Sequence, residues 1–272
     1  MQTTLRAAAI QLNAGLDKSR NLATAERLVR QAAAAGAQLV VLPELFNAYG
    51  PLSDVVAQAE AIPGPTSERC GALARELGIT LCAGSICERD AESVHGYNTS
   101  LIFSPNGGLV AKYRKMHLFD VEIPGQVSVR ESESMRCGTW ARATATPIAM
   151  LGQAICYDLR FPELFRVLAK QGLEVLLLPS AFTAVTGRDH WDVLVRARAI
   201  ENQCYIVAAN QYGAHSGKLA SYGGSLIVDP WGQIIAQASL AEEAVLVADL
   251  SAEVLMQTRT RVPALRHRSP HL

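Results

Sequence analysis

Two short, continuous apolar runs constrain the fold of this chain more than any other feature. Leu39-Val-Val-Leu42 and Val175-Leu-Leu-Leu178 each follow a helix-like segment that ends at a glycine. Runs of this length are typical of strands buried on both faces of a sheet. Residues 36–43 and 172–179 match as glycine, apolar strand and proline, which favours two similar α/β halves, although this order is also common by chance in α/β proteins. Two such halves predict a four-layer α-β-β-α sandwich with the sheets face to face.

Periodic patterns predict the remaining elements, and no Pro-, Gly- or Ser-rich linker divides them, so we expect residues 1–272 to form a single domain. The segment 117–137 has weak periodicity and many polar residues, and it is interpreted as a long functional loop. The expected helices span about 21–35, 67–77, 162–171, 189–202 and 251–260. The other expected strands span 5–12, 79–87, 97–103, 109–113, 204–209, 224–229, 233–238 and 244–249.

Composition excludes several classes of function. Lys plus Arg and Asp plus Glu both number 25 in this 272-residue chain, so its charge indicates no nucleic-acid or anionic-membrane partner. The six cysteines form no CxxC pair and no zinc-like cluster, so no metal is expected. The first residues lack a signal-peptide pattern, and no apolar run approaches the roughly 18 residues of a membrane helix. We therefore expect a cytoplasmic protein with reduced thiols.

Three residues of reactive type follow predicted strands. Cys156 comes at the end of the run that closes with Ile155, and Pro162 then opens a helix, so the thiol lies at a strand-to-helix elbow. Glu44 follows the first buried strand, and Lys115 precedes the long loop. Each has an ordinary alternative: a small buried thiol, a charge at a helix N-terminus and a solvated lysine.

Taken together, these three residues suit amide cleavage through a thiol. Such a reaction needs a base that takes the S–H proton, a positive charge or N–H donors at the oxyanion, and a proton for the leaving nitrogen. Glu44, Lys115 and Cys156 meet these needs without histidine, metal or cofactor. The histidines His117 and His190 could form a Cys-His dyad, but this chemistry does not require one, and His117 is better explained as a hydrogen-bonding partner.

Long motifs in the same order resemble the nitrilase superfamily of carbon–nitrogen hydrolases, from about residue 5 to 272. The resemblance is strongest to its nitrilase-like branch, which contains amidases of deaminated glutathione and omega-amidases. It implies an α-β-β-α sandwich and a Glu-Lys-Cys triad. The matching motifs are PELFNAYG (43–50), RKMHLFDVEIPGQ (114–126), AICYDLRFPEL (154–164), PSAFTAVTGRDHW (179–191), RARAIENQCYIVAANQ (196–211) and SYGGSLIVDPWG (221–232).

The resemblance assigns roles to the catalytic residues. Glu44 would be the general base and later the acid, Lys115 would stabilise the oxyanion, and Cys156 would be the nucleophile. The backbone N–H of Tyr157 would be the second oxyanion donor. A second glutamate beside the lysine falls on Glu131, with the neighbouring acids Glu122 and Glu133 as alternatives.

Arg160 is the predicted substrate anchor. It lies four residues past Cys156, where it could bind a substrate carboxylate as a bidentate pair. The alternative is a surface arginine, or one that pairs with Asp158 or Glu163. By resemblance, three further residues would contact the substrate: Phe182, Thr186 and Tyr49. For the aromatic residues Phe182 and Tyr49, packing is the more usual role. Gly223-Gly224 stands where some members of the branch have a histidine, which bears on substrate preference.

The resemblance implies a linear amide with a carboxylate as substrate, namely deaminated glutathione, cleaved to 2-oxoglutarate and cysteinylglycine. The alternative is omega-amidase activity, which releases ammonia from 2-oxoglutaramate or succinamate. A catalytically silent binding subunit is an alternative of another class, and a thiol-redox role would need a resolving cysteine near Cys156. The basic tail 259–272 is expected to pack at a subunit interface of a homodimer or larger homo-oligomer.

Overall fold

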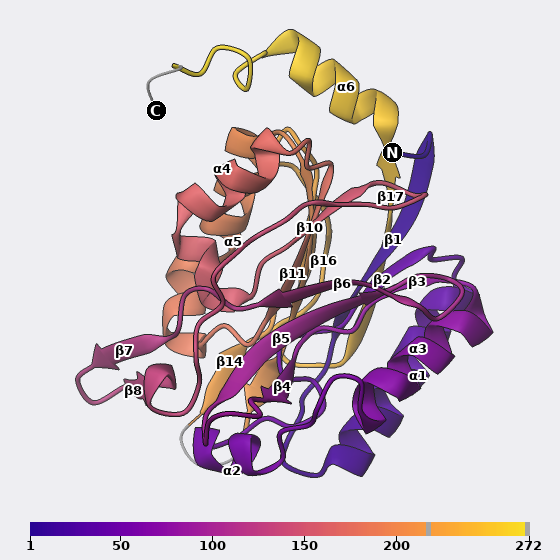
Figure 1. Cartoon of the computed structure of the whole chain (residues 1–272). Coiled ribbons are helices and arrows are strands. Elements are labelled where there is room, and N and C mark those ends of the chain that lie inside the picture. The colour runs from indigo at the N-terminus through magenta and orange to yellow at the C-terminus, as the bar shows by residue number, and fades with distance from the viewer. Residues whose placement is uncertain (216–218, 270–272) are drawn as a thin grey trace.

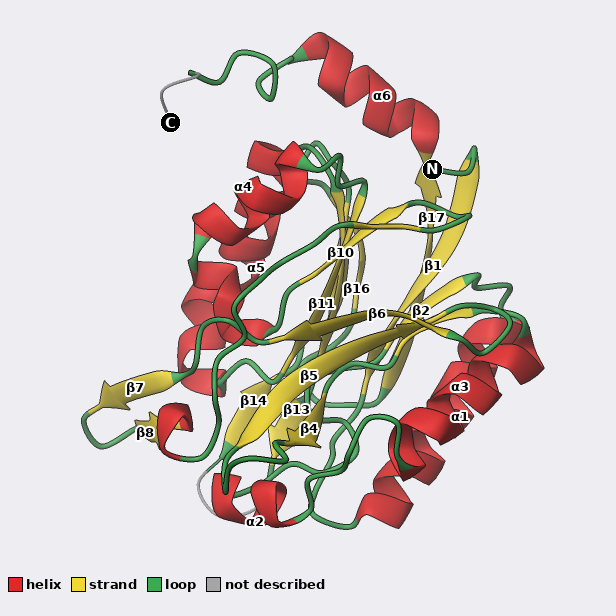
Figure 2. Cartoon of the chain, in the orientation of Figure 1, coloured by secondary structure: helices red, strands yellow, loops and turns green. Residues whose placement is uncertain are grey.

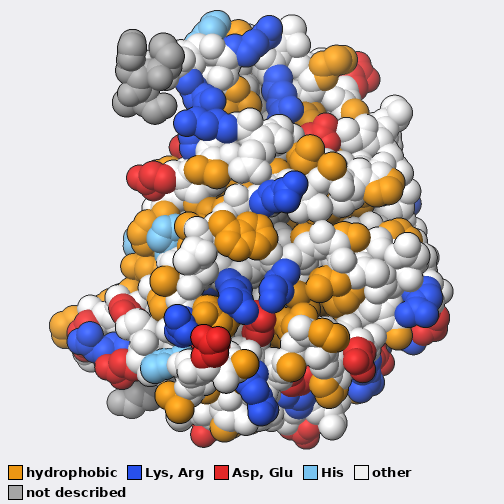
Figure 3. All heavy atoms as spheres, in the orientation of Figure 1, with side chains coloured by type: hydrophobic (Ala, Val, Ile, Leu, Met, Phe, Trp, Pro, Cys, Tyr) orange, Lys and Arg blue, Asp and Glu red, His pale blue; other side chains and the backbone are white. Residues whose placement is uncertain are grey.

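Two sheets lie face to face, and each is covered on its outer side by helices (Figures 1 and 2). This is the arrangement seen in the computed structural model of the chain, which describes residues 1–215 and 219–269. The predicted four-layer α-β-β-α sandwich is confirmed. On the face shown in Figure 3, basic, acidic and hydrophobic side chains are mixed rather than gathered by charge, in keeping with the balanced composition.

The first sheet has three parallel strands at its centre, β1, β2 and β3, extended by antiparallel strands on both sides. β3 and β4 both pair with β5, and β6 pairs with β5 as well. In sheet order, the strands are β17 (Ala244–Ser251), β1 (Thr4–Gln11), β2 (Leu39–Val41), β3 (Thr80–Cys82), β5 (Gly96–Phe103) and β4 (Ile86–Arg89), with β6 (Leu109–Arg114) on β5.

The second sheet repeats this plan with parallel β10, β11 and β12 at its centre. Its outer strands are again antiparallel, and two small hairpins complete the β-structure. In sheet order, the strands are β16 (Ile234–Gln237), β15 (Leu226–Val228), β12 (Tyr205–Asn210), β11 (Val175–Ser180), β10 (Met150–Gln153) and β9 (Thr144–Ala145). The hairpins are β7 (Asp120–Ile123) with β8 (Val127–Arg130) and β13 (Tyr212–Ala214) with β14 (Ala220–Tyr222).

Helices α1 and α3 cover the first sheet, and α4 and α5 cover the second (Figure 1). Two short 3-10 helices, η1 and η2, lie near the reactive residues. The bounds are α1 (Lys18–Ala34), α2 (Leu52–Ala57), α3 (Pro65–Leu77), η1 (Glu131–Glu133), η2 (Cys156–Arg160), α4 (Pro162–Lys170), α5 (Ala184–Asn202) and α6 (Ala252–Arg261).

The apolar runs that predicted buried strands are β2 and β11, and their alternation builds three hydrophobic layers. In β2, Leu39 and Val41 face the second sheet, where they share a core with Val175 and Leu177 of β11. Val40 faces outward into the core beneath α1 and α3. Because successive side chains point to opposite faces, one continuous apolar run can fill two layers at once.

Several expected boundaries are wrong. The expected strand 79–87 is two strands, because Gly84 turns between β3 and β4 with a φ of +46°; a Cβ there would lie 2.0 Å from the Pro43 oxygen. The expected loop 117–137 carries the β7–β8 hairpin and η1. Helix α5 begins five residues earlier than expected, and the strand expected at 224–229 covers only 226–228. α2, β9, β13 and β14 were not predicted.

The predicted tail begins inside α6, and residues 270–272 of it lie outside the described part of the chain. Arg259 of α6 donates to the backbone oxygens of Gln203 (3.1 Å) and Leu173 (2.5 Å). α6 therefore contacts the end of the second sheet of its own chain. Among the described residues, no helix combines the length and apolarity needed to span a bilayer.

Candidate active site

The three predicted reactive residues lie together at one end of the two sheets. Glu44 follows β2, Lys115 follows β6, and Cys156 opens η2 three residues beyond the end of β10. All three line the same pocket. The two halves meet there, since the Glu44 N–H donates to the oxygen of Ser180 at 3.4 Å, and Ser180 ends β11.

Left-handed backbone occurs at one of these residues and directly after another. Cys156 itself has a φ of +45°, and Leu45, next to Glu44, has a φ of +47°. Non-glycine residues rarely adopt this region, and when they do they cluster at functional sites. Cys156 thus lies at the sharp strand-to-helix elbow expected from the sequence.

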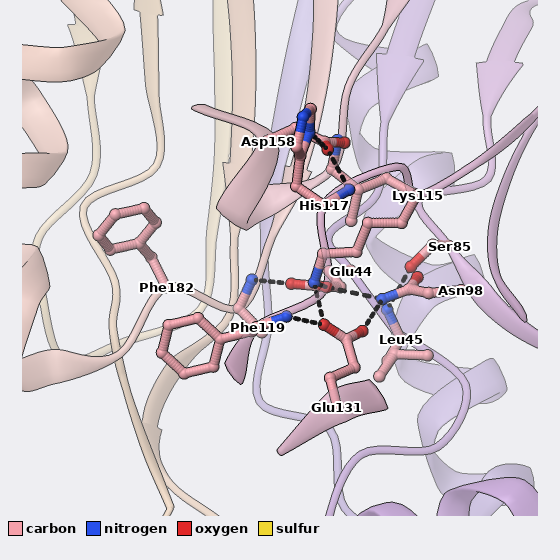
Figure 4. Close-up of polar contacts among 12 residues, drawn as sticks. Glu44, Leu45, Ser85, Asn98, Lys115, His117, Phe119, Glu131, Asp158 and Phe182 are labelled. Carbon is pink, nitrogen blue, oxygen red and sulfur yellow. Dashed lines mark hydrogen bonds and ion pairs between the residues drawn. The ribbon is translucent and has the colours of Figure 1, made fainter. Parts of the chain in front are cut away.

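Lys115 is held between two carboxylates (Figure 4). Its Nζ lies 3.0 Å from Oε1 of Glu44 and 2.8 Å from Oε2 of Glu131. Only 2% of the lysine is exposed. Burial opposes its charge, but the negative charges of Glu131 and Glu44 outweigh burial and raise the lysine pKa well above its ordinary value. Lys115 is therefore a fixed positive charge.

Of the three glutamates considered in the loop, the structure places Glu131 against Lys115. Its Oε2 also accepts from the Phe119 N–H at 2.7 Å. Glu122 is exposed and accepts from the Ser128 hydroxyl, and Glu133 is exposed beside Arg130. The formation of η1 turns the Glu131 side chain inward, while its neighbours remain outside.

The Cys156 thiol is buried beside Glu44. Burial raises the thiol pKa well above its ordinary value, and the Glu44 charge raises it further. Lys115 and a hydrogen bond from the Ala181 N–H act in the opposite direction but do not outweigh these effects. The resting thiol is therefore protonated, and its proton must pass to a nearby base before sulfur can attack.

Asp158 forms hydrogen bonds both with the elbow that carries Cys156 and with residues on either side of Lys115. It is fully buried, and its carboxylate accepts from the Ile155 N–H (2.8 Å) and the Tyr113 hydroxyl (2.7 Å). It also accepts from the His117 N–H at 3.1 Å and lies 2.7 Å from Nδ1 of that histidine (Figure 4). His117 is thus a hydrogen-bonding partner, as expected. The sequence suggested Asp158 only as a partner of Arg160. Among the described ion pairs, Asp158 pairs with His117 instead.

Asn98 is the residue of the site that sequence analysis missed. It is fully buried in β5, and its Nδ2 donates to Oε1 of Glu44 at 2.7 Å and to Oε1 of Glu131 at 3.3 Å. Its position in β5, where Thr99 and Ser100 are also polar and buried, gives no distinct signal of this role. The contact spans 54 residues of sequence to Glu44 and depends on how β5 packs beside β2 and β3.

The pocket encloses about 630 Å³ of space, including its mouth, and all nine predicted site residues line it. Arg160 lies over the ring of Phe182, with its guanidinium carbon 5.0 Å from the ring centre. Among the described residues, its polar contact is with Nδ1 of His190 at 3.2 Å, rather than with Asp158 or Glu163. The guanidinium therefore keeps its charge at the pocket wall. The predicted residues in the lining are Glu44, Lys115, Cys156, Glu131, Tyr157, Arg160, Phe182, Thr186 and Tyr49.

Gly223 and Gly224 lie outside the pocket lining. Both have positive φ values, +78° and +61°, and the Gly224 oxygen accepts from the Trp191 indole N–H at 2.8 Å. Trp191 is thus a packing residue. In the described part of the chain, no three His, Cys, Asp or Glu side chains are grouped so that they could hold a metal ion.

Comparison with known proteins gives consistent matches. The family model described as carbon-nitrogen hydrolase matches residues 6–260. Human deaminated glutathione amidase is 44% identical over 271 residues, which cover 97% of this chain and 82% of the human protein. Omega-amidase NIT2 of Xenopus tropicalis is 42% identical over 251 residues, covering 92% of this chain and 90% of that protein.

Solved structures match equally well. The C. elegans NitFhit protein superposes with a TM-score of 0.91 at 40% identity; the match covers 98% of this chain but only 65% of that longer chain. Saccharomyces cerevisiae Nit3, described as a member of branch 10 of the nitrilase superfamily, has a TM-score of 0.87 at 34% identity, with 96% and 95% of the two chains covered.

Proposed function

The chain belongs to the carbon–nitrogen hydrolase family, and we propose that it cleaves linear amides through a thioester formed on Cys156. It is a hydrolase of carbon–nitrogen bonds other than peptide bonds. The observation that carries the proposed mechanism is the arrangement of a buried thiol, a carboxylate in the same pocket and one lysine fixed by two glutamates. This arrangement provides a nucleophile, a proton acceptor and a positive charge within one pocket.

In the first half-reaction, Glu44 takes the proton of the Cys156 thiol as sulfur attacks the amide carbon. The carbonyl double bond opens to an oxyanion, which Lys115 and the Tyr157 backbone N–H stabilise. As the oxyanion collapses, the C–N bond breaks and Glu44 gives its proton to the leaving nitrogen. The products of this step are an amine or ammonia and a thioester on Cys156.

In the second half-reaction, water hydrolyses the thioester. Glu44, again a carboxylate, takes a proton from water while the water oxygen attacks the thioester carbon. The C–S bond then breaks, the acid is released, and the thiolate recovers its proton from Glu44. Glu44 acts as base and acid in turn, whereas Glu131 keeps Lys115 charged throughout.

We propose deaminated glutathione as the substrate, with 2-oxoglutaramate or succinamate as the alternative. The names of the two relatives support both. Arg160 supports a substrate with a free carboxylate near the scissile amide, the feature these substrates share, because among the described residues no acid forms an ion pair with its guanidinium. Phe182, Thr186 and Tyr49 would shape the same acyl pocket.

The decisive experiment incubates the purified protein with each amide and measures cysteinylglycine and ammonia. We expect turnover of at least one, and Cys156→Ala should abolish it while Cys137→Ser, at an exposed thiol, should not. A Cys156→Ala variant with wild-type rates would exclude the thioester mechanism. If neither product appears but iodoacetamide still labels Cys156, the substrate is another amide or a nitrile. If Cys156 is not labelled either, the result favours a silent binding subunit.

We further propose that residues 1–272 act as a single catalytic domain in the cytoplasm, in a homodimer or larger homo-oligomer. The core shared by both sheets supports one folding unit. Exposed apolar side chains on α5 and beyond β15, which include Val193, Ile200 and Trp231, support a subunit interface. Size-exclusion chromatography with light scattering measures the oligomeric state directly.

A further inference from the structure

Asn98 contacts both glutamates of the site, as Lys115 does, but it does so as a neutral donor (Figure 4). Each of its two N–H groups serves one carboxylate, and both acceptors are the Oε1 atoms. The residue is fully buried, so water does not compete for these hydrogen bonds. Hydrogen bonds from buried donors to charged acceptors are among the stronger ones in proteins.

This orientation of the Asn98 amide has an energetic cost. Its Oδ1 is buried and has no hydrogen-bond partner in the described part of the chain. A buried acceptor without a partner destabilises the fold. Turning the amide over would place Oδ1 against two carboxylates, which repulsion forbids. The orientation therefore serves the two carboxylates at the expense of the amide oxygen.

The two carboxylate oxygens of Glu44 accept hydrogen bonds from different donors. Oε1 accepts from both Asn98 and the charged Lys115, whereas Oε2 accepts from the Ala181 N–H at 2.8 Å and from neither of these two side chains. The same Ala181 N–H also bonds the Cys156 thiol. Oε2 is thus the less occupied oxygen and the one that shares a neighbour with the thiol, which makes it the better proton acceptor.

We propose that Asn98 is a positioning residue of the proposed reaction: it occupies Oε1 of Glu44, holds this carboxylate in place beside Glu131, and leaves Oε2 to take the Cys156 proton. The inference rests on the proposed function of Glu44 and Cys156. Asn98 itself touches neither the substrate nor the thiol. Without its donors, Lys115 alone would contact the two carboxylates, and Oε1 of Glu44 would lose one of its two hydrogen bonds.

The test compares Asn98→Asp and Asn98→Leu with matched variants at Asn202. Asn202 is also fully buried, its Nδ2 donates to a backbone oxygen and a carboxylate, and its Oδ1 also has no partner. It lies at the end of α5, outside the pocket. Asn202→Asp and Asn202→Leu therefore report the cost of losing a buried amide that has no part in the site.

The first readout is the pH profile of Cys156 alkylation by iodoacetamide, followed by mass spectrometry of the Cys156 peptide, which needs no substrate. The aspartate adds a third negative charge beside Glu44, so its profile should move to higher pH by at least about one unit. The leucine should give a smaller shift in the same direction. The titratable groups around the two carboxylates are Lys115, Cys156, Tyr49 and Cys87.

The second readout is amide turnover. Both Asn98 variants should lose kcat roughly ten- to a hundredfold near neutral pH, with KM little changed. Asn98→Asp should recover part of this loss at higher pH, and the Asn202 variants should follow the wild type. Alkylation and turnover profiles that keep the wild-type pH dependence in both Asn98 variants would overturn the proposal. If the wild type turns over neither amide, the substrate proposal fails, but the alkylation profiles still decide the role of Asn98.

Discussion

Two charge clusters lie back to back at the same point of the first sheet, and they differ in which charge is in excess. Asn98 and Lys115 face the pocket, whereas their chain neighbours Thr99 and Arg114 face the opposite side, because successive side chains of a strand alternate. On the pocket side, one lysine contacts two carboxylates. On the other side, two cations contact a single carboxylate, that of Glu88.

The Glu88 cluster is saturated. Its carboxylate accepts from Thr99 Oγ1 (2.8 Å), Lys112 Nζ (2.9 Å) and two nitrogens of Arg114 (both 2.8 Å). The Arg114 guanidinium also lies 3.7 Å from the ring centre of Tyr97. Burial favours the protonated carboxyl, but the hydrogen bonds of Arg114, Lys112 and Thr99 outweigh it and lower the Glu88 pKa to about 2. This carboxylate does not take up a proton near neutral pH.

The pocket cluster has the opposite balance. With one positive and two negative charges, it holds one carboxylate more than its lysine can neutralise. In the proposed reaction, Glu44 would accept the proton of the neighbouring thiol while Lys115 stays paired with Glu131. Neighbouring residues of the same two strands can thus form either a structural or a reactive ion cluster, depending on whether positive or negative charges are in excess.

The largest expected effect is at Glu44. Glu44→Gln should lower kcat by roughly 10²- to 10⁴-fold, because no base then takes the Cys156 proton. The matched variant Glu88→Gln should keep its activity but lose roughly 1.5 to 3 kcal/mol of unfolding free energy, because it gives up charged hydrogen bonds. Steady-state kinetics and urea unfolding measure the two effects. If Glu88→Gln lost activity as severely as Glu44→Gln, the two clusters would not differ as described.

A somewhat smaller loss of turnover is expected when the central cation is removed. Lys115→Met should reduce kcat by roughly 10²- to 10³-fold, since the oxyanion loses its charged donor. It should also destabilise the fold by roughly 3 to 5 kcal/mol, because two buried carboxylates remain without a cation.

Lys112→Met is the control for this charge deletion. Glu88 keeps Arg114, and Lys112 is 35% exposed, so we expect unchanged turnover and a loss of at most about 1 kcal/mol. Equal destabilisation of the two methionine variants in urea would contradict the difference in burial and excess charge between the clusters.

The residues at the ends of apolar runs could be predicted from the sequence. β2 and β11 identify the sandwich, and Glu44 and Cys156 follow strands that end at the same edge. Asn98 could not be predicted, because its role depends on contacts with residues 54 and 33 positions away. Whether an acid in the 117–137 segment points inward depends on one turn of 3-10 helix, which periodicity does not reveal.

The start of α5 was missed for a local reason. Gly187 lies within its first turns, and glycine there is unfavourable for a helix. A Cβ at this position would lie 2.3 Å from Cβ of Tyr222, so the glycine allows the helix to pack closely against β14. Here tertiary packing outweighs helix propensity, and no local pattern could reveal it.

The saturated cluster also predicts a pH dependence of stability. The Glu88 pKa is lowered from 4.5 to about 2 in the folded protein, so its contribution is fully present above pH 4.5 and is lost as the pH falls towards 2. It amounts to about 2 to 3 kcal/mol. Urea unfolding of the wild type and Glu88→Gln between pH 6 and the lowest pH at which both fold measures it, because other carboxyls cancel in the difference. A difference that stays constant below pH 4.5 would contradict the lowered pKa.

The smallest effect is expected at the acids that flank Glu131. Glu122 and Glu133 are exposed, outside both clusters, and each could replace Glu131 only if the loop register differed. Glu122→Gln and Glu133→Gln should each keep wild-type kcat and change the unfolding free energy by no more than about 0.5 kcal/mol. The same assays as for Glu44→Gln measure both quantities. A hundredfold loss of kcat in either variant would move the second glutamate away from Glu131 and remove the charge balance that distinguishes the pocket cluster from the Glu88 cluster.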